Sequence, residues 1–190
     1  KLKLDSREKS INESLKKNDD IKQWTRSEVL KDYRFYIISL NMLSMPSIAT
    51  GVFVYQSFIL TSKSWGPFIM AQSFMAYSIL SVITLSISGF LIDKFTSRKL
   101  LIYMNIPLFM STIVLYLFDK PFFSFVFLGL IGITNGFANV LGSSTWAEIY
   151  GVKHIGAIKA LTSGLMVFAT ATGTALFGFL IDAGYTINLI

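Results

Sequence analysis

Long apolar stretches alternate with short charged segments along most of the chain. Five apolar runs hold no charged side chain before their last residue or two, except Lys159 near the start of the fifth run. A helix rises about 1.5 Å per residue, so about 20 residues cross a hydrocarbon core of about 30 Å. The pattern therefore predicts five membrane-spanning helices, at roughly residues 35–60, 67–92, 100–118, 121–146 and 157–181.

Residues 1–34 follow a different pattern, with mixed charges and few apolar positions. Residues 1–24 hold too little apolar surface to fold alone, so we expect a flexible loop there. Thr25 and Glu28 have the spacing of a reciprocal helix cap, which predicts a short interfacial helix that ends near Arg34. No stacking aromatics alternate with the lysines, and a membrane span follows directly. We therefore expect no nucleic-acid partner.

Composition supports a membrane protein and excludes several kinds of chemistry. Charged residues make up 15% of the chain and hydrophobic residues 53%, whereas soluble domains have about 25% charged residues. Cysteine is absent and His154 is the single histidine. Disulfides, thiolate metal sites, histidine metal clusters and a Ser–His–Asp triad are therefore excluded within this chain, and we expect no cofactor.

The basic residues set the orientation. Ten of the 17 Lys and Arg lie in residues 1–34, and five more fall in loops on the same side of the predicted spans. Only Lys63 and Lys120 fall on the other side. Positive residues favour the cytoplasmic side, which predicts a multi-pass protein of the cytoplasmic (inner) membrane with residues 1–34 inside. Asp93 is then cytoplasmic and Asp182 is outside.

The pentapeptide Gly-Phe-Leu-Ile-Asp occurs twice, at residues 89–93 and 178–182, and closes the second and the fifth run. Either the repeat is chance in a chain rich in these residues, or it marks two three-helix units of inverted topology, as in many transporters. The second reading predicts an all-α half bundle with five spans present and a sixth missing. The first residue is Lys and a new apolar stretch begins near Tyr185, so we expect a fragment of a longer protein.

The loop at residues 89–99, Gly-Phe-Leu-Ile-Asp-Lys-Phe-Thr-Ser-Arg-Lys, resembles the signature loop of the major facilitator superfamily, G-x-L-x-D-R/K-x-G-R/K-R/K. It departs at Thr96, where Gly is usual, and at Ser97, where a basic residue is common. Residues 24–35, 46–51, 148–156 and 178–185 look like parts of helices seven to eleven of bacterial oxalate/formate and monocarboxylate carriers. The resemblance implies a C-terminal half whose partner, an N-terminal six-helix half, is missing.

The resemblance also implies a conformational latch at the inner surface. Its expected members are Gly89, Asp93, Lys94, Arg98 and Glu148. Asp93 would dock on the N-terminus of the fifth span, near Gly156, in one conformation, because a helix N-terminus carries partial positive charge. Arg98 would pair with Glu148. Alternatively, Asp93 only marks the end of the second span.

Polar side chains inside the predicted spans point to a water-filled cavity or to a partner helix. Asn135, Asn139, Ser143 and Trp146 share one face of the fourth span, while Gly132 and Gly136 lie off that face and suit close packing. Ser and Thr side chains more often bond within or between helices. Pro46 should kink the first span. The candidates for lining a substrate cavity are Asn41, Tyr55, Gln56, Gln72, Asn135 and Asn139.

These features favour a carrier that moves a small solute through the bilayer by alternating access, and not an enzyme. A membrane-embedded enzyme lacks the clustered His, Cys or paired carboxylates that it needs, and a channel lacks a repeated pore-lining ring. A non-transporting receptor or regulator on the same scaffold stays open. Lys159 is close to the inner surface, so an anionic substrate would need a cation from the missing half.

Overall fold

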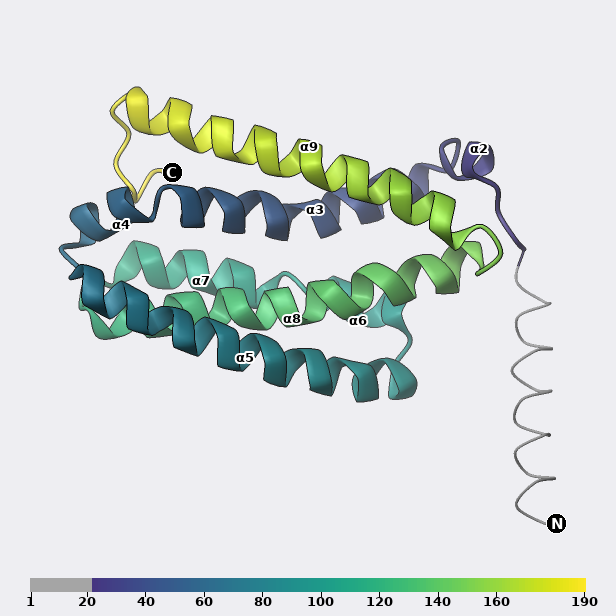
Figure 1. Ribbon diagram of the computed structural model, residues 1–190, viewed down its shortest axis with the longest axis horizontal. Coiled ribbons are helices and arrows are strands. Elements are labelled where there is room, and N and C mark those ends of the chain that lie inside the picture. The colour runs from purple at the N-terminus through teal and green to yellow at the C-terminus, as the bar shows by residue number, and fades with distance from the viewer. Residues whose placement is uncertain (1–21) are drawn as a thin grey trace, which may run out of the picture.

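The computed structural model describes residues 22–190 and is all helical in that range (Figure 1). Expectations for residues 1–21 lie outside the described part. Five helical segments are long and apolar enough to cross a membrane, as the sequence predicts: Tyr33–Val54, Pro67–Lys94, Ser97–Leu117, Phe122–Tyr150 and Ile155–Asp182. The short helix α2 (Arg26–Val29) precedes them, and Glu28 with Thr25 forms the predicted capping box.

The first apolar run is not one continuous helix. Helix α3 (Tyr33–Val54) ends at Tyr55, and α4 (Gln56–Lys63) continues to a turn at Ser64. Pro46 remains inside α3, where its ring nitrogen has no hydrogen to donate to the carbonyl of Met42. The run thus yields a spanning helix and a separate short helix at its far end, where the pattern predicted one segment.

The third span is also divided, into α6 (Ser97–Tyr103) and α7 (Ile106–Leu117). Pro107 stands in the first turn of α7, a position that tolerates proline, whereas the interior of a longer helix does not. The break leaves backbone groups near Leu101 and Asn105 that need partners from outside the helix.

Two helix pairs hold the bundle together. The most extensive contacts join α5 (Pro67–Lys94) to α8 (Phe122–Tyr150), and the next most extensive join α3 to α9 (Ile155–Asp182). Figure 1 shows each pair running side by side. In span numbers, one pair joins the second span to the fourth, and the other joins the fifth span to the first. If the fourth span is the counterpart of the first and the fifth that of the second, the two pairs are equivalent. This is the relation that two inverted three-helix units predict.

Glycine permits the close approach in both pairs. A Cβ on Gly136 of α8 would lie 2.6 Å from the carbonyl oxygen of Ser81 on α5. A Cβ on Gly173 of α9 would lie 2.8 Å from the carbonyl oxygen of Ser47 on α3. Neither position has room for a side chain, so small residues set the spacing of these helices. The packing role predicted for Gly136 is confirmed.

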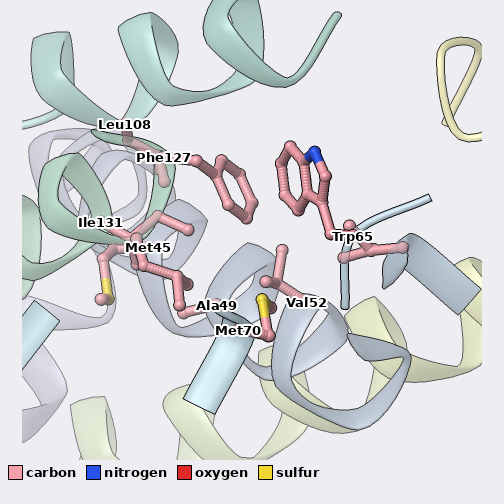
Figure 2. Packing of buried hydrophobic residues seen from close by; sticks show 10 residues of the cluster. Met45, Ala49, Val52, Trp65, Met70, Leu108, Phe127 and Ile131 are labelled. Carbon is pink, nitrogen blue, oxygen red and sulfur yellow. The ribbon is translucent and has the colours of Figure 1, made fainter. Parts of the chain in front are cut away.

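The largest apolar cluster fills the half of the bundle near α4. Figure 2 shows Trp65 and Phe127 beside Met70 and Val52, with Ile131 and Leu108 farther along. The Trp65 ring nitrogen donates to the carbonyl oxygen of Asp119 at 2.6 Å. This bond and the apolar packing join the α4–α5 turn to the α7–α8 turn.

The two ends of the bundle differ in charge. One end, which we call the basic end, gathers α2, the α5–α6 turn and the α8–α9 turn, with Arg34, Arg98 and Lys153 among its residues. At the opposite end Lys63 is buried and pairs with Asp119 at 2.7 Å. Asp93 lies at the basic end of α5 and Asp182 at the opposite end of α9. The two pentapeptides therefore end at opposite ends of the bundle.

Candidate functional site

A pocket of about 160 Å³ opens between α3, α8 and α9. Asn135 and Asn139 line it from α8, and Trp146 lies nearer the basic end. Both asparagines were predicted cavity residues. The remaining lining is mostly apolar and comes from all three helices: Ser39, Met42, Leu43, Met45, Pro46, Ala138, Gly142, Thr162, Leu165 and Met166.

The polar groups of this pocket are held by neighbouring helices. Asn135, near the middle of α8, donates from Nδ2 to the Ser81 hydroxyl on α5 at 2.9 Å. Asn139 donates to the Asn135 carbonyl oxygen at 2.9 Å and is exposed. Its side-chain oxygen accepts no hydrogen bond within residues 22–190, so it is available to water or to a solute.

Ser39 adds a second unsatisfied polar group. Its side chain is 5% exposed, lines the pocket, and has a hydroxyl oxygen with no hydrogen-bond partner in the described residues. A buried hydroxyl without a partner costs about 1–3 kcal/mol. Water or a polar solute in the pocket would remove this cost.

Asn41 does not line this pocket, although it was a predicted cavity residue. Its Nδ2 donates to the Leu101 carbonyl oxygen at 3.1 Å. Asn105 in turn donates to the Asn41 carbonyl oxygen at 2.7 Å and to the Ser44 hydroxyl at 2.8 Å. The first bond gives a donor to a backbone carbonyl next to the α6–α7 break, and the other two join the break to α3. Pro107, two residues after Asn105, is the sequence signal that could have revealed this role.

Three other predicted cavity residues lie away from the pocket between α3, α8 and α9. Tyr55 stands at the α3–α4 break and its hydroxyl packs against Gly178 of α9. Gln56 is the half-buried first residue of α4, and Gln72 is exposed on α5. Tyr55 lines a separate, more open hollow with Thr170 and other residues of α9.

Arg98 and Glu148, expected to pair at the inner latch, lie together in the structure. Arg98 Nε is 3.5 Å from Glu148 Oε1. The backbone N–H of Ser97 donates to Glu148 Oε2 at 2.9 Å, and the Ser97 hydroxyl donates to the same oxygen. Ser97 was noted in the sequence only as a departure from the expected basic residue. Its buried hydroxyl instead binds the carboxylate directly.

Asp93, in contrast, does not reach the N-terminus of α9 in this structure. Its side chain is exposed and makes no hydrogen bond or ion pair within residues 22–190. Figure 1 shows α5 and α9 on opposite sides of α8. Lys94 lies over the Phe95 ring at 5.6 Å, and Gly89 has open space where a Cβ would project. The contact expected of Asp93 is therefore absent from this structure.

An aromatic cluster, unforeseen in the sequence, ties the segment before α3 to the α8–α9 turn. The backbone N–H of Trp24 donates to the Tyr150 carbonyl oxygen at 3.0 Å, and the Tyr150 hydroxyl donates to Asp32 at 3.1 Å. Trp146 stacks on Tyr150 at 5.9 Å and contacts Phe35 at 5.3 Å. Because Trp146 also lines the pocket, the cluster connects the basic end of the bundle to the pocket wall.

Glu28, in the segment before α3, has a carboxyl group whose pKa is well below its usual value. The backbone N–H of Thr25 and the Lys22 ammonium hold the pKa of the Glu28 carboxyl at about 2. The carboxylate therefore stays ionised, and the cap of α2 stays formed, throughout the physiological pH range.

No curated protein and no solved structure matches this chain. A family model does match, described as Major Facilitator Superfamily and covering residues 12–188. The match extends over all five spans, both pentapeptides and the pocket. The chain is a multi-pass membrane protein that belongs to the Major Facilitator Superfamily, a family of membrane transporters.

Proposed function

We propose that this chain is part of a secondary active or facilitative carrier that moves a small solute across the cytoplasmic membrane by alternating access. It would supply helices seven to eleven, in the C-terminal half, and form one wall of the cavity against an N-terminal six-helix half. The likeness to oxalate/formate and monocarboxylate carriers rests on the sequence stretches described above.

The observation that carries this proposal is the pocket wall at mid-membrane. Asn135 lies near the middle of α8, and Asn139 follows one turn later with its side chain exposed. An exposed amide in contact with lipid tails would be costly, whereas one facing a water-filled cavity is satisfied. Carriers of this architecture bind their solutes near the midplane, where two repeats meet.

The residues at the basic end supply the proposed latch. Arg98 and Glu148 join α6 to α8, while Asp93 is exposed and able to meet a new partner. In the alternate state Asp93 would approach the N-terminus of α9, where free N–H groups and the helix dipole favour a carboxylate. Lys94 and Gly89 flank it at the end of α5. Residues 1–34 would lie in the cytoplasm.

Accessibility from the two sides of the membrane tests the proposal. Asn139→Cys introduces a thiol into a chain that has no cysteine. The complete carrier with this substitution is reconstituted in oriented vesicles. Alternating access predicts that a membrane-impermeant maleimide labels this thiol from either side. Added solute should change the ratio of the two rates.

Phe109→Cys is the matched control, because Phe109 is 67% exposed on α7 and should face lipid. Its thiol should resist the reagent from both sides. Labelling of Asn139→Cys from one side only, whatever solute is present, would rule out alternating access.

A further inference from the structure

Methionine thioethers form much of the pocket between α3, α8 and α9. Met42 and Met45 line it from α3, and Met166 lines it from α9. Met45 is buried, whereas Met166 is 49% exposed, so a bound solute would cover it. The side chain of methionine is flexible and polarizable, and it packs well against aromatic rings. These three residues therefore suit an apolar group, and above all a ring.

No charged side chain lines this pocket within residues 22–190. Its polar groups are neutral: the amides of Asn135 and Asn139 and the hydroxyls of Ser39 and Thr162. Transfer of a carboxylate or an ammonium from water into such a site is costly, because no opposite charge offsets the loss of hydration. The Ser39 hydroxyl and the Asn139 side-chain oxygen have no partner in the described residues. They can therefore bond to an amide, a carbonyl or a hydroxyl group of a solute.

The size of the pocket limits the size of the group that it holds. Its volume of about 160 Å³ is close to that of an apolar cavity of about 150 Å³ that binds benzene in another protein. Trp146 lines the pocket and is held in place, because its ring stacks on Tyr150 at 5.9 Å and contacts Phe35 at 5.3 Å. A fixed aromatic residue and flexible thioethers together fit one flat ring.

We propose that this pocket binds the apolar ring of an uncharged solute, and that an amide, carbonyl or hydroxyl group beside the ring bonds to Asn139 and Ser39. This inference rests on the proposed function and names the substrate class. Met42, Met45 and Met166 would contact the ring and so determine specificity. The class differs from the anionic solutes of the oxalate/formate and monocarboxylate carriers that the sequence stretches resemble.

Gly142 offers a way to fill the pocket without separating the helices. It lines the pocket, and a Cβ at this position meets no other atom within 4 Å. Gly142→Leu should therefore place its side chain in the space that the ring would occupy. Gly164→Leu is the matched control, because a Cβ on Gly164 of α9 also meets nothing within 4 Å and this residue does not line the pocket. Thermal unfolding of the complete carrier shows whether both variants are folded.

Titration of the purified complete carrier, followed by fluorine NMR, measures binding. The probe is para-fluorobenzamide. Its counterparts are para-fluorobenzoate and para-fluorobenzylammonium, which are charged, and fluoroacetamide, which lacks the ring. We expect saturable binding of para-fluorobenzamide, with a Kd at least tenfold below that of each counterpart. Gly142→Leu should raise this Kd at least tenfold, and Gly164→Leu should leave it unchanged. Met166→Ala shortens an exposed lining side chain and should raise the Kd several-fold, which keeps the test valid if Gly142→Leu does not fold.

The outcomes separate this inference from the proposed function. The inference would be overturned by a lack of saturable para-fluorobenzamide binding, by equal or tighter binding of any counterpart, or by a wild-type Kd in folded Gly142→Leu or in Met166→Ala. If Asn139→Cys is labelled from both sides in that case, the solute class is wrong and the carrier stands. If para-fluorobenzamide binds as expected but labelling comes from one side only, the carrier proposal fails and the ligand class of the pocket stands.

Discussion

The carboxylate of Glu148, near the end of α8, accepts a hydrogen bond of 2.9 Å from the backbone N–H of Ser97, the first residue of α6. The Ser97 hydroxyl donates to the same carboxylate oxygen, and Arg98 Nε lies 3.5 Å from the other oxygen. One carboxylate thus satisfies a backbone donor at a helix start and fixes α6 against α8.

Replacement of Glu148 by glutamine should therefore destabilise the protein. Glu148→Gln keeps the shape of the side chain but removes the charge that strengthens these hydrogen bonds. We expect a loss of about 1–2 kcal/mol in the free energy of unfolding, mostly through Ser97, because charged hydrogen bonds contribute about 1.5–3 kcal/mol and the Arg98 pair is partly exposed. Denaturant or thermal unfolding of the purified carrier measures this loss. Asp182→Asn, an exposed carboxylate at the opposite end, should change stability little; equal losses in the two variants would contradict the assigned role.

Asp93 should behave in the opposite way. Its exposed carboxylate has no hydrogen bond or ion pair within residues 22–190, so Asp93→Asn should leave the amount of folded protein and the unfolding midpoint unchanged. If Asp93 docks on α9 in the alternate conformation, transport should slow several-fold. Uptake and thermal unfolding, measured on the same preparation, check both halves. Unchanged turnover would show that Asp93 only ends α5.

The packing of α5 on α8 leads to a third expected outcome. Gly136→Ala puts a Cβ 2.6 Å from the Ser81 carbonyl oxygen and 2.7 Å from Thr84 Cβ. The helices must separate, and overpacking of this kind costs about 1–3 kcal/mol. Gly142→Ala is the matched control on the same helix, since a Cβ there meets nothing within 4 Å. It should be neutral or slightly stabilising, because alanine is the better helix former. The unfolding midpoints of the two variants decide the matter.

The five spans could be predicted from the sequence because the hydrocarbon core of the membrane excludes charged side chains and unpaired backbone groups at every position of a span. A segment without charges, about 20 residues long, has few other structures available in a bilayer. The alternation of the spans and the distribution of basic residues predicted that the second and fifth spans end at opposite faces, and Asp93 and Asp182 do lie at opposite ends of the bundle. The glycines at 132 and 136 were also assigned correctly, because close helix packing has few other solutions.

The site was harder to predict, because a polar residue in a span can face a cavity or another helix. Asn139 and Asn41 looked equivalent in the sequence, yet one lines the pocket and the other bonds to Leu101. The difference arises at the α6–α7 break, where the Leu101 carbonyl oxygen accepts a hydrogen bond from Asn41. Likewise, the Lys159 ammonium donates to the Ser143 hydroxyl on another helix, a contact that the sequence does not reveal. Contacts between helices distant in sequence decide these roles.

The same contrast gives the last prediction. Asn41→Ala should lower the free energy of unfolding by about 1 kcal/mol, because the Leu101 carbonyl oxygen loses the Asn41 donor and keeps only the longer bond from the Met104 N–H at 3.4 Å. Asn105 keeps its bonds to the backbone carbonyl of residue 41 and to the Ser44 hydroxyl. The affinity of this variant for the solute should change little.

Asn139→Ala removes an exposed amide whose one hydrogen bond is to its own helix. The free energy of unfolding should therefore stay within about 0.5 kcal/mol of the wild type, while the KM for uptake rises several-fold. Unfolding and uptake kinetics on both variants test the assignment together. If Asn41→Ala raised the KM and Asn139→Ala destabilised the protein, the two roles would be reversed. The solute would then bind on the side of α3 that carries Asn41.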